Sequence, residues 1–376
     1  MKLTRYEYFE NDGWTFDPIN FDNINLIVGA TGSGKTRLLA TIFNHGKFIA
    51  SGQTPAPGEW NFQLRNETHN YDYSHLTIHD KVRGNLVKTE ILVANDRKTG
   101  VSRTLIERNE NKIKFNGNDL PKLSAEQPAI SLLKEEEDIA PVFRFFTRIR
   151  RRNFFGDEFS KATAASTLSK QADQVFHKEK ELEFLVGKDF PLSTILYYLK
   201  EMHSERYKLI IDYYTTIFPF IESCSIHPIK RPRVKISTGE ESFAFHIKER
   251  KVGQHIPLQE LSSGMQKVLL ILVDVLSVPN DILYIIDEYE NSLGVNAIEF
   301  LPDLLASHGQ NNQFIITTHH PYLINNMPMD RWQILHRTGS HVNIMPGTTL
   351  VEKYGKSKQQ AFIKLINDPF YTEGIA

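Results

Sequence analysis

Residues 29–36 read Gly29-Ala30-Thr31-Gly32-Ser33-Gly34-Lys35-Thr36, which fits the pattern G-x-x-x-x-G-K-[ST]. Glycines let such a loop curl so that its backbone N–H groups point inward at an anion. The loop follows the apolar run 24–28 and precedes a stretch with helical spacing, so a strand–loop–helix unit is predicted. Every residue of the loop is expected to line a bound ATP. Lys35 should reach the β- and γ-phosphates, and the Thr36 hydroxyl should coordinate Mg²⁺.

A second polar site follows the apolar segment 282–286, which is predicted to be a buried strand. Open α/β sheets bind ligands at the carboxyl ends of their strands, where Asp287 and Glu288 are placed. Asp287 is expected to hold the Mg²⁺ shell, and Glu288 to polarise the attacking water. The alternative is that the two carboxylates cap the next helix.

The segment 261–267 reads Leu261-Ser262-Ser263-Gly264-Met265-Gln266-Lys267. A serine and a glycine before a helix make an anion-binding N-terminus, although an ordinary serine N-cap has the same pattern. The segment resembles the signature motif of ABC-type ATPases, L-S-G-G-Q or L-S-G-G-E. Ser262 and Gly264 match, Ser263 replaces a glycine, and Met265 replaces the Gln or Glu. The resemblance implies that Ser262, Ser263 and Gly264 contact ATP bound on a second head.

Two further segments fall where this resemblance requires them. Residues 288–293 (EYENSL) resemble the stretch D-E-P-E-x-x-L-H that leads into the D-loop, with Gly294 in place of the histidine. Residues 314–321 (FIITTHHP) resemble the strand that ends at the switch histidine. His319 is the matching position and is implied to sense the γ-phosphate. A histidine after a strand is otherwise an ordinary polar residue, so the order of the four motifs carries the identification.

The long segment between the loop and the signature favours one branch of the ABC-type ATPases. Residues 62–115 alternate as in an antiparallel meander, and residues 130–221 have a helical period. A transporter subunit has a much shorter gap, whereas the soluble RecF, SMC and OLD-type group resembles this arrangement. The expected fold is an α/β P-loop NTPase: an ABC-type head with a mainly parallel core sheet, an antiparallel β-lobe and a helical insertion. The expected lobes of this single head are 1–125, 126–225 and 226–376.

The segment after His319 bears on which related proteins this sequence resembles in function. OLD-type proteins continue after the switch histidine into a Toprim nuclease domain, for which residues 320–376 are too few. Residues 321–325 (PYLIN) resemble the small standalone members of the group. This resemblance implies an ATPase switch that closes as a homodimer and controls a partner effector, such as a nuclease, in anti-phage defence. The alternative is a RecF- or SMC-like DNA-binding ATPase in DNA repair. The effector, the trigger, any assembly above a dimer and the hydrolysis rate stay open.

Two clusters of basic residues could form the DNA-binding surface of the alternative function. Such clusters with aromatic neighbours bind phosphates and stack bases. The first is interleaved with Phe145, Phe146 and Phe154, and its arginines are Arg144, Arg148, Arg150, Arg151 and Arg152. The second comprises Lys230, Arg231, Arg233 and Lys235. The competing interpretations are a solvated helix face with phenylalanines in the core, and a docking surface for the partner. Gln127 is a candidate γ-phosphate-sensing glutamine.

Bulk properties set the remaining limits. The formal charge is -1 and the sequence pI about 6.9, so global charge gives no argument for nucleic acid. Cys224 is the only cysteine, so no internal disulfide forms. The N-terminus lacks an apolar signal-peptide core, and the longest apolar run, 268–278, is too short to span a bilayer. A cytoplasmic location without membrane attachment is therefore expected.

Overall fold

The computed structural model describes all residues except 11–12, 111, 153–165, 169–181, 186–189, 229–240, 278–279, 289–294, 309–310, 356–360 and 376. The chain forms two compact units. The first contains residues 1–152, 281–288 and 310–376, and the second contains 153–280 and 289–309. The boundaries of these two units differ from those of the expected lobes, 1–125, 126–225 and 226–376.

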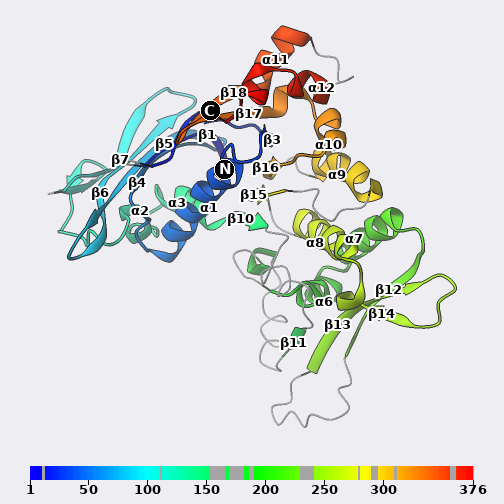
Figure 1. Cartoon of the computed structure of the whole chain (residues 1–376). Helices are drawn as coiled ribbons and strands as arrows, with labels where there is room; N and C mark the ends of the chain where they lie inside the picture. The colour runs from blue at the N-terminus through cyan, green and yellow to red at the C-terminus, as the bar shows by residue number, and fades with distance from the viewer. Residues whose placement is uncertain are drawn as a thin grey trace. The chain divides into compact units, whose positions relative to one another are not determined.

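The nucleotide motifs of the first unit lie in the parallel part of a sheet, which has fourteen strands among the described residues (Figure 1). Neighbouring strands in this part run parallel, in the order β10 (Ile149–Arg152), β15 (Leu283–Ile286), β16 (Gln313–Thr317), β3 (Ile24–Gly29) and β17 (Trp332–Thr338). The residues of β15 and β16 are buried throughout, as expected for parallel strands covered on both faces. Because parallel strands end at one edge, β3, β15 and β16 bring the phosphate loop, Asp287 and Thr317 together.

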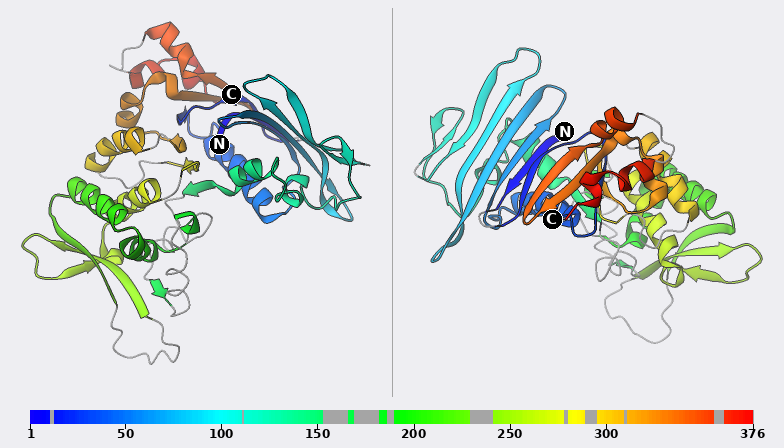
Figure 2. Two further views of the ribbon diagram at one scale, coloured as in Figure 1. Left: turned by 180° about the vertical axis from the view of Figure 1, so that it is seen from behind. Right: turned by 45° about the horizontal axis from the view of Figure 1, so that its top comes forward.

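The same sheet continues into the predicted antiparallel lobe. The order beyond β17 is β18 (His341–Pro346), β2 (Thr15–Asn20), β1 (Lys2–Phe9), β4 (Gly58–Arg65), β5 (His69–Asp80), β6 (Gly84–Asp96), β7 (Ser102–Arg108), β8 (Ile113–Phe115) and β9 (Asn118–Asp119). Buried and exposed residues alternate along β4 and β5, so one face of the lobe is apolar. Figure 2 shows the lobe as one curved layer with α1 (Lys35–Ser51) along one face. The meander predicted at 62–115 is confirmed.

The helical expectation for residues 130–221 is only partly right. Helices α2 (Ala129–Leu132) and α3 (Ala140–Thr147) form, but residues 149–152 are strand β10. Consecutive arginines give no strand signal in the sequence. The strand forms because it pairs with β15, a segment more than 130 residues later in the chain. A tertiary contact has therefore overridden the local pattern.

The end of the chain completes the first unit with short helices. They are α10 (Pro321–Asn326), the 3₁₀ turn η3 (Met329–Arg331), α11 (Gly347–Tyr354), α12 (Ala361–Ile366) and α13 (Pro369–Thr372). Residues 356–360, between α11 and α12, lie outside the described part. Ile375 pairs with Arg337 of β17 as an isolated bridge.

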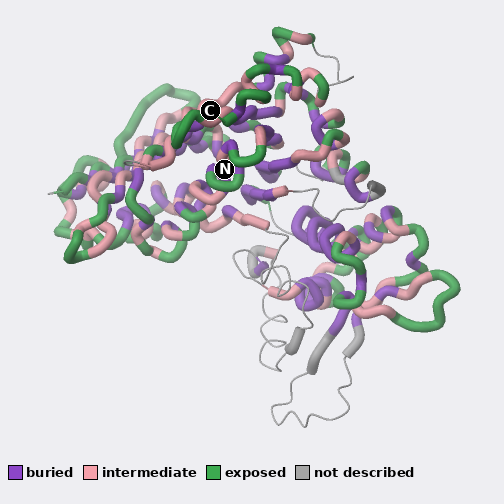
Figure 3. Tube along the Cα trace, viewed as in Figure 1, coloured by how far each residue is buried: buried purple, intermediate pink, exposed green. Residues whose placement is uncertain are grey.

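The second unit is built around one apolar helix. Residues 265–276 of α8 (Ser263–Leu276) are all buried, as Figure 3 shows. Helices α6 (Leu192–Met202), α7 (Ser204–Ile217) and α9 (Val295–His308) pack against it. A small sheet contains β11 (Ser166–Leu168), β12 (Ile221–Pro228), β13 (Glu241–Glu249) and β14 (His255–Pro257). The 3₁₀ turns are η1 (Leu182–Leu185) and η2 (Leu258–Glu260). No helix in the described residues is both long and apolar enough to cross a membrane.

A buried polar network fills the core between α1 and the antiparallel lobe. The Glu90 carboxylate accepts hydrogen bonds from the backbone N–H groups of Ala129 (2.5 Å) and Ile130 (2.9 Å), and from the Tyr73 hydroxyl (3.1 Å). An Arg108 guanidinium nitrogen lies 3.8 Å from the same carboxylate. Glu90 therefore fixes the start of α2, and burial raises the pKa of this carboxyl group.

Two histidines are buried beside this network. The His45 ring on α1 lies 5.0 Å from Trp60 and 4.9 Å from Phe62, and 5.1 Å from His75 on β5. Burial lowers the pKa of His45 well below its usual value. Burial and, to a smaller extent, the Arg108 charge lower the pKa of His75 to about 3. Both rings are therefore neutral in the folded protein at ordinary pH.

Acid is expected to destabilise the first unit through these histidines. Histidine in an unfolded chain has a pKa near 6.5, so below that pH the unfolded state binds protons that the folded state does not. This stability is complete above pH 6.5 and is lost as the pH falls toward about 3. Between pH 7 and pH 5, the free energy of unfolding falls by about 2 kcal/mol because of His75. The substitution His45→Phe should weaken the pH dependence of the melting temperature, whereas exposed His79→Gln should not. Identical pH profiles for all three proteins would contradict this account.

Candidate functional site

The phosphate loop has the geometry that its glycines predict. Gly32 and Gly34 have φ values of 87° and 99°, in the left-handed region that favours glycine. A Cβ atom at Gly29 would lie 2.6 Å from the Ser33 Oγ, so only glycine fits there. Helix α1 begins directly after the loop at Lys35, whose Nζ donates to the carbonyl oxygens of Gly29 (2.8 Å) and Ala30 (3.0 Å). The loop is therefore closed around the lysine that would receive the phosphates.

Asp287 lies beside Thr36, as a metal site requires. The Thr36 hydroxyl donates to Asp287 Oδ1 at 3.3 Å, and the Thr317 hydroxyl donates to the same oxygen at 2.7 Å. Register explains the second contact, because Ile286 pairs with Ile316 and the next residues are Asp287 and Thr317. Hydroxyl and carboxylate oxygens are the hard ligands that Mg²⁺ prefers, so the donor set fits this ion. Among the described residues, no group of three or more His, Cys, Asp and Glu side chains is arranged to hold a metal ion.

Glu288 begins the turn after β15 in a strained conformation. Its φ of 49° lies in the left-handed region, which a non-glycine residue seldom adopts. Its backbone N–H donates to the Thr317 hydroxyl at 2.7 Å. Thr317 thus orients both the metal carboxylate and the turn that carries the candidate catalytic base. Backbone strain of this kind is concentrated at functional sites.

The two histidines after β16 have different roles. His320 is the N-cap of α10, since its Nδ1 accepts from the backbone N–H of Tyr322 at 3.3 Å. Its side chain therefore fixes the start of α10. His319, half-buried, comes two residues after Thr317 at the same sheet edge as Asp287. The candidate switch histidine therefore follows β16, the strand that pairs with the one leading to Asp287. The D-loop segment 289–294 lies outside the described residues.

The signature segment lies in the second unit, at the start of α8. The Ser262 side chain caps the helix by accepting from the backbone N–H of Met265 at 3.3 Å. Met265 is buried, and Gln266 Nε2 donates to the carbonyl oxygens of Leu258 and Leu261. Ser262 and Ser263 are exposed, and Gly264 is half-buried. The helix end is ordered and accessible, as a contact to a second head would require.

Three predicted contact residues have other surroundings. Gln127 lies near Gly52 at the carboxyl end of α1, with its Nε2 3.9 Å from a Cβ placed there. The phosphate loop is at the other end of this 17-residue helix, about 25 Å away, so Gln127 does not sense the γ-phosphate. Phe145 and Phe146 are core residues, not platforms for stacking bases. The cluster Lys230, Arg231, Arg233 and Lys235, like Phe154, lies outside the described residues.

The first arginine cluster does not form one helical face. Arg144 is exposed on α3, whereas Arg150, Arg151 and Arg152 lie half-buried on β10. Adjacent strand residues point to opposite faces of a sheet, so these three do not share a surface. Arg151 pairs with Asp287, with 3.2 Å between Nη2 and Oδ2. No local pattern in the sequence predicts the contacts of Arg151 and Thr317 with Asp287, because both contacts depend on the order of strands in the sheet.

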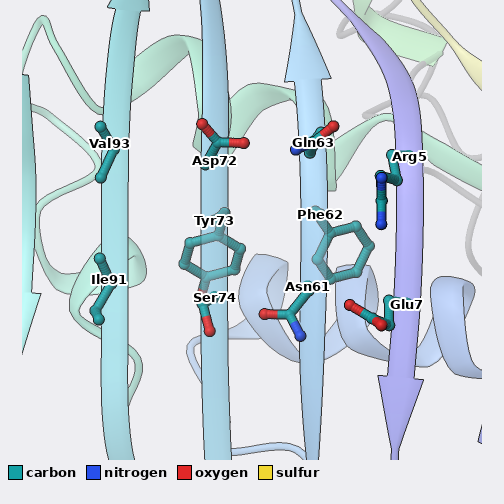
Figure 4. Close-up of a pocket in the computed structure, with 10 residues that line it drawn as sticks. All are labelled: Arg5, Glu7, Asn61, Phe62, Gln63, Asp72, Tyr73, Ser74, Ile91 and Val93. Carbon is teal, nitrogen blue, oxygen red and sulfur yellow. The ribbon is translucent and has the colours of Figure 1, made fainter. Parts of the chain in front are cut away.

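A hollow of about 390 Å³ lies away from these residues, on the outer face of the antiparallel lobe (Figure 4). Pairing across β1, β4, β5 and β6 aligns one row of side chains, from Glu7 through Asn61 and Ser74 to Ile91. Phe62 and Tyr73, between the outward-facing residues, contact His45 on the other face. The hollow is therefore separated from the phosphate loop by the sheet itself.

The strand–loop–helix unit, the following aspartate strand and their shared sheet edge define a P-loop nucleoside triphosphatase. The family model described as "AAA domain, putative AbiEii toxin, Type IV TA system" matches residues 24–325. The chain belongs to this family of ATPases, in agreement with the ABC-type ATPase predicted from the motifs. Among curated proteins, none matches the chain.

Solved structures of SMC heads are similar to the chain. An Smc head bound to the C-terminal winged-helix domain of ScpA is 12% identical, covers 92% of this chain and 97% of its own, and has a TM-score of 0.49. The SMC head domain from Thermotoga maritima is 16% identical and has a TM-score of 0.38. The match covers 92% of this chain and 99% of that structure. The Smc head from Pyrococcus furiosus, bound to the C-terminal domain of ScpA, is 13% identical and has a TM-score of 0.44. The match covers 93% of this chain and 98% of that structure.

Proposed function

We propose that the chain is an ATP-binding and ATP-hydrolysing switch that closes as a head-to-head homodimer. The observation that carries the proposal is the convergence of Lys35, Thr36 and Asp287 at one sheet edge, with 3.3 Å between the Thr36 hydroxyl and the Asp287 carboxylate. The exposed N-terminus of α8, with Ser262 and Ser263, supplies what a second head would add.

The mechanism follows from what each group can hold. Lys35 binds the phosphates, and Thr36 and Asp287 hold Mg²⁺, which when bound neutralises phosphate charge. Ser262 of a second head then contacts the γ-phosphate and closes the dimer. Glu288 polarises the attacking water, and His319 stabilises the γ-phosphate. Since ADP lacks the γ-phosphate, hydrolysis removes the contact that favours the closed state.

Complementation between two defective chains tests whether the site is completed in trans. Lys35→Ala removes the phosphate ligand and keeps the signature, whereas Ser263→Arg blocks the exposed helix end and keeps the Ser262 cap. Each variant alone should be inactive. A mixture should regain hydrolysis, because the Ser263→Arg nucleotide site meets the intact signature of the Lys35→Ala chain. A mixture as inactive as its components, with each variant folded and Ser263→Arg still binding ATP, would refute completion in trans.

We further propose that this switch controls a partner effector, such as a nuclease, in anti-phage defence. The family description names a putative toxin of a type IV toxin–antitoxin system. This description supports a role of the chain in a toxin–antitoxin system. The test is co-purification of the Glu288→Gln variant, expressed with its genomic neighbours, with and without ATP. A stoichiometric protein partner that is toxic when released supports this role. Recovery of the homodimer alone would count against it.

The DNA-binding alternative has less structural support. Phe145 and Phe146 are buried, and Arg151 is paired with a carboxylate, so neither these two aromatic rings nor this arginine is available to DNA. Exposed Arg144 remains as a phosphate contact. Recovery of nucleic acid without a protein partner in the same co-purification would shift the assignment to a RecF-like DNA ATPase.

A further inference from the structure

The Asp287 carboxylate already has a cationic partner within the chain. Arg151 Nη2 lies 3.2 Å from Asp287 Oδ2, and the two side chains are only 18% and 10% exposed. The other oxygen, Oδ1, accepts hydrogen bonds from Thr317 and Thr36. The carboxylate to which we assign Mg²⁺ is therefore held on one side by hydroxyl groups and on the other by a guanidinium.

The parallel pairing of β10 with β15 explains this contact. Arg151 is the register partner of Ile285, and side chains two residues apart on a strand point to the same face. Asp287 is thus on the face of Arg151, about 6.6 Å further along the strand direction, a distance that an extended arginine can span. Arg150 is the partner of Tyr284 and points to the opposite face. Only Arg151 of the three arginines on β10 is directed at Asp287.

The arginine and a metal ion would compete for this carboxylate. Arginine stays protonated at all ordinary pH values, so it cannot lose its charge when Mg²⁺ arrives. Two cations at one carboxylate repel each other, and the repulsion is stronger where water is largely excluded. The Arg151 Nε is also buried without a hydrogen-bond acceptor among the described residues, so the guanidinium is only partly satisfied where it lies.

We propose that Arg151 is a positioning residue that closes the metal site in the nucleotide-free head. Its ion pair with Asp287 opens when Mg²⁺ binds, so the arginine raises the Mg²⁺ concentration needed for nucleotide binding. Binding of Mg²⁺ and movement of the Arg151 side chain are therefore coupled. This inference rests on the proposed function, because it assigns a regulator to the same metal carboxylate.

The test is a Mg²⁺ titration of the binding of a fluorescent ATP analogue, at a temperature well below melting. Arg151→Ala should lower the Mg²⁺ concentration at half-maximal binding by about tenfold, the factor that corresponds to about 1.4 kcal/mol. Arg151→Gln keeps a polar side chain without the charge and should shift the midpoint in the same direction. Arg151→Lys keeps the charge and should stay near the wild-type value. Arg150→Ala, on the same strand but the other face, is the matched control.

The outcomes separate this inference from the proposed function. An unchanged or higher Mg²⁺ midpoint in both Arg151→Ala and Arg151→Gln would overturn the role of Arg151. The role is also overturned if the two variants melt at lower temperature with wild-type midpoints, since the ion pair would then be structural only. If wild-type protein bound no nucleotide at any Mg²⁺ concentration, the proposed function itself would fail.

Discussion

Replacing Glu288 with glutamine is expected to slow ATP hydrolysis by about 10²- to 10⁴-fold and to leave ATP binding intact. Glu288 follows Asp287 in a turn whose backbone is fixed by the Thr317 hydroxyl. Glutamine has nearly the same shape and can adopt the same turn, but it cannot accept a proton from the attacking water. Phosphate release under single-turnover conditions measures the rate, and a fluorescent ATP analogue measures the affinity.

Two comparisons make this result specific. Glu352→Gln removes an exposed carboxylate on α11 and should hydrolyse ATP at the wild-type rate. In size-exclusion chromatography, Glu288→Gln with ATP should elute as a dimer, because the γ-phosphate contact persists. Hydrolysis at the wild-type rate in Glu288→Gln would show that another group is the base.

Loss of the Lys35 ammonium group should weaken ATP binding by about 100-fold, or about 2.8 kcal/mol, the scale of hydrogen bonds to a charged group. Lys35 is 7% exposed, and its Nζ already lies among the carbonyl oxygens of the loop. Lys35→Ala removes the charge and the side chain together. Lys35→Met keeps the apolar stem, so it tests the charge with less change in packing. Calorimetric titration with a non-hydrolysable ATP analogue gives both affinities.

A lysine at the far end of the same helix is the control. Lys47 is exposed on α1, about 18 Å along the helix from Lys35, and Lys47→Ala should bind ATP like the wild type. Near-normal affinity in Lys35→Met, with unchanged melting behaviour, would contradict the assignment of the loop to the nucleotide phosphates.

Local signals account for much of the candidate site. The glycines of the phosphate loop, the apolar strands before Asp287 and Thr317, and the helix after Ser262 each have a short-range pattern that the structure confirms. The candidate γ-phosphate-sensing glutamine has no such local pattern. Gln127 follows the meander in sequence, but the path of the chain carries it to the distal end of α1.

Contacts between distant segments account for the rest. Arginines 150–152 have no strand pattern, and their helical appearance was wrong because β10 forms only by pairing with β15. In the DNA-binding alternative Arg151 belongs to a nucleic-acid surface, whereas register places it against the Asp287 carboxylate. No local pattern predicts which of three adjacent arginines will face Asp287.

The class of fold and the chemistry of the loop can be predicted from local sequence, because a phosphate-binding turn depends on glycines within eight residues and on the helix that follows them. The side chains that surround Asp287 cannot be predicted in this way. That set combines Thr36 at the start of α1 with Arg151 on β10 and Thr317 on β16. Their proximity follows from strand order and register, and these are fixed by packing and pairing across the whole sheet.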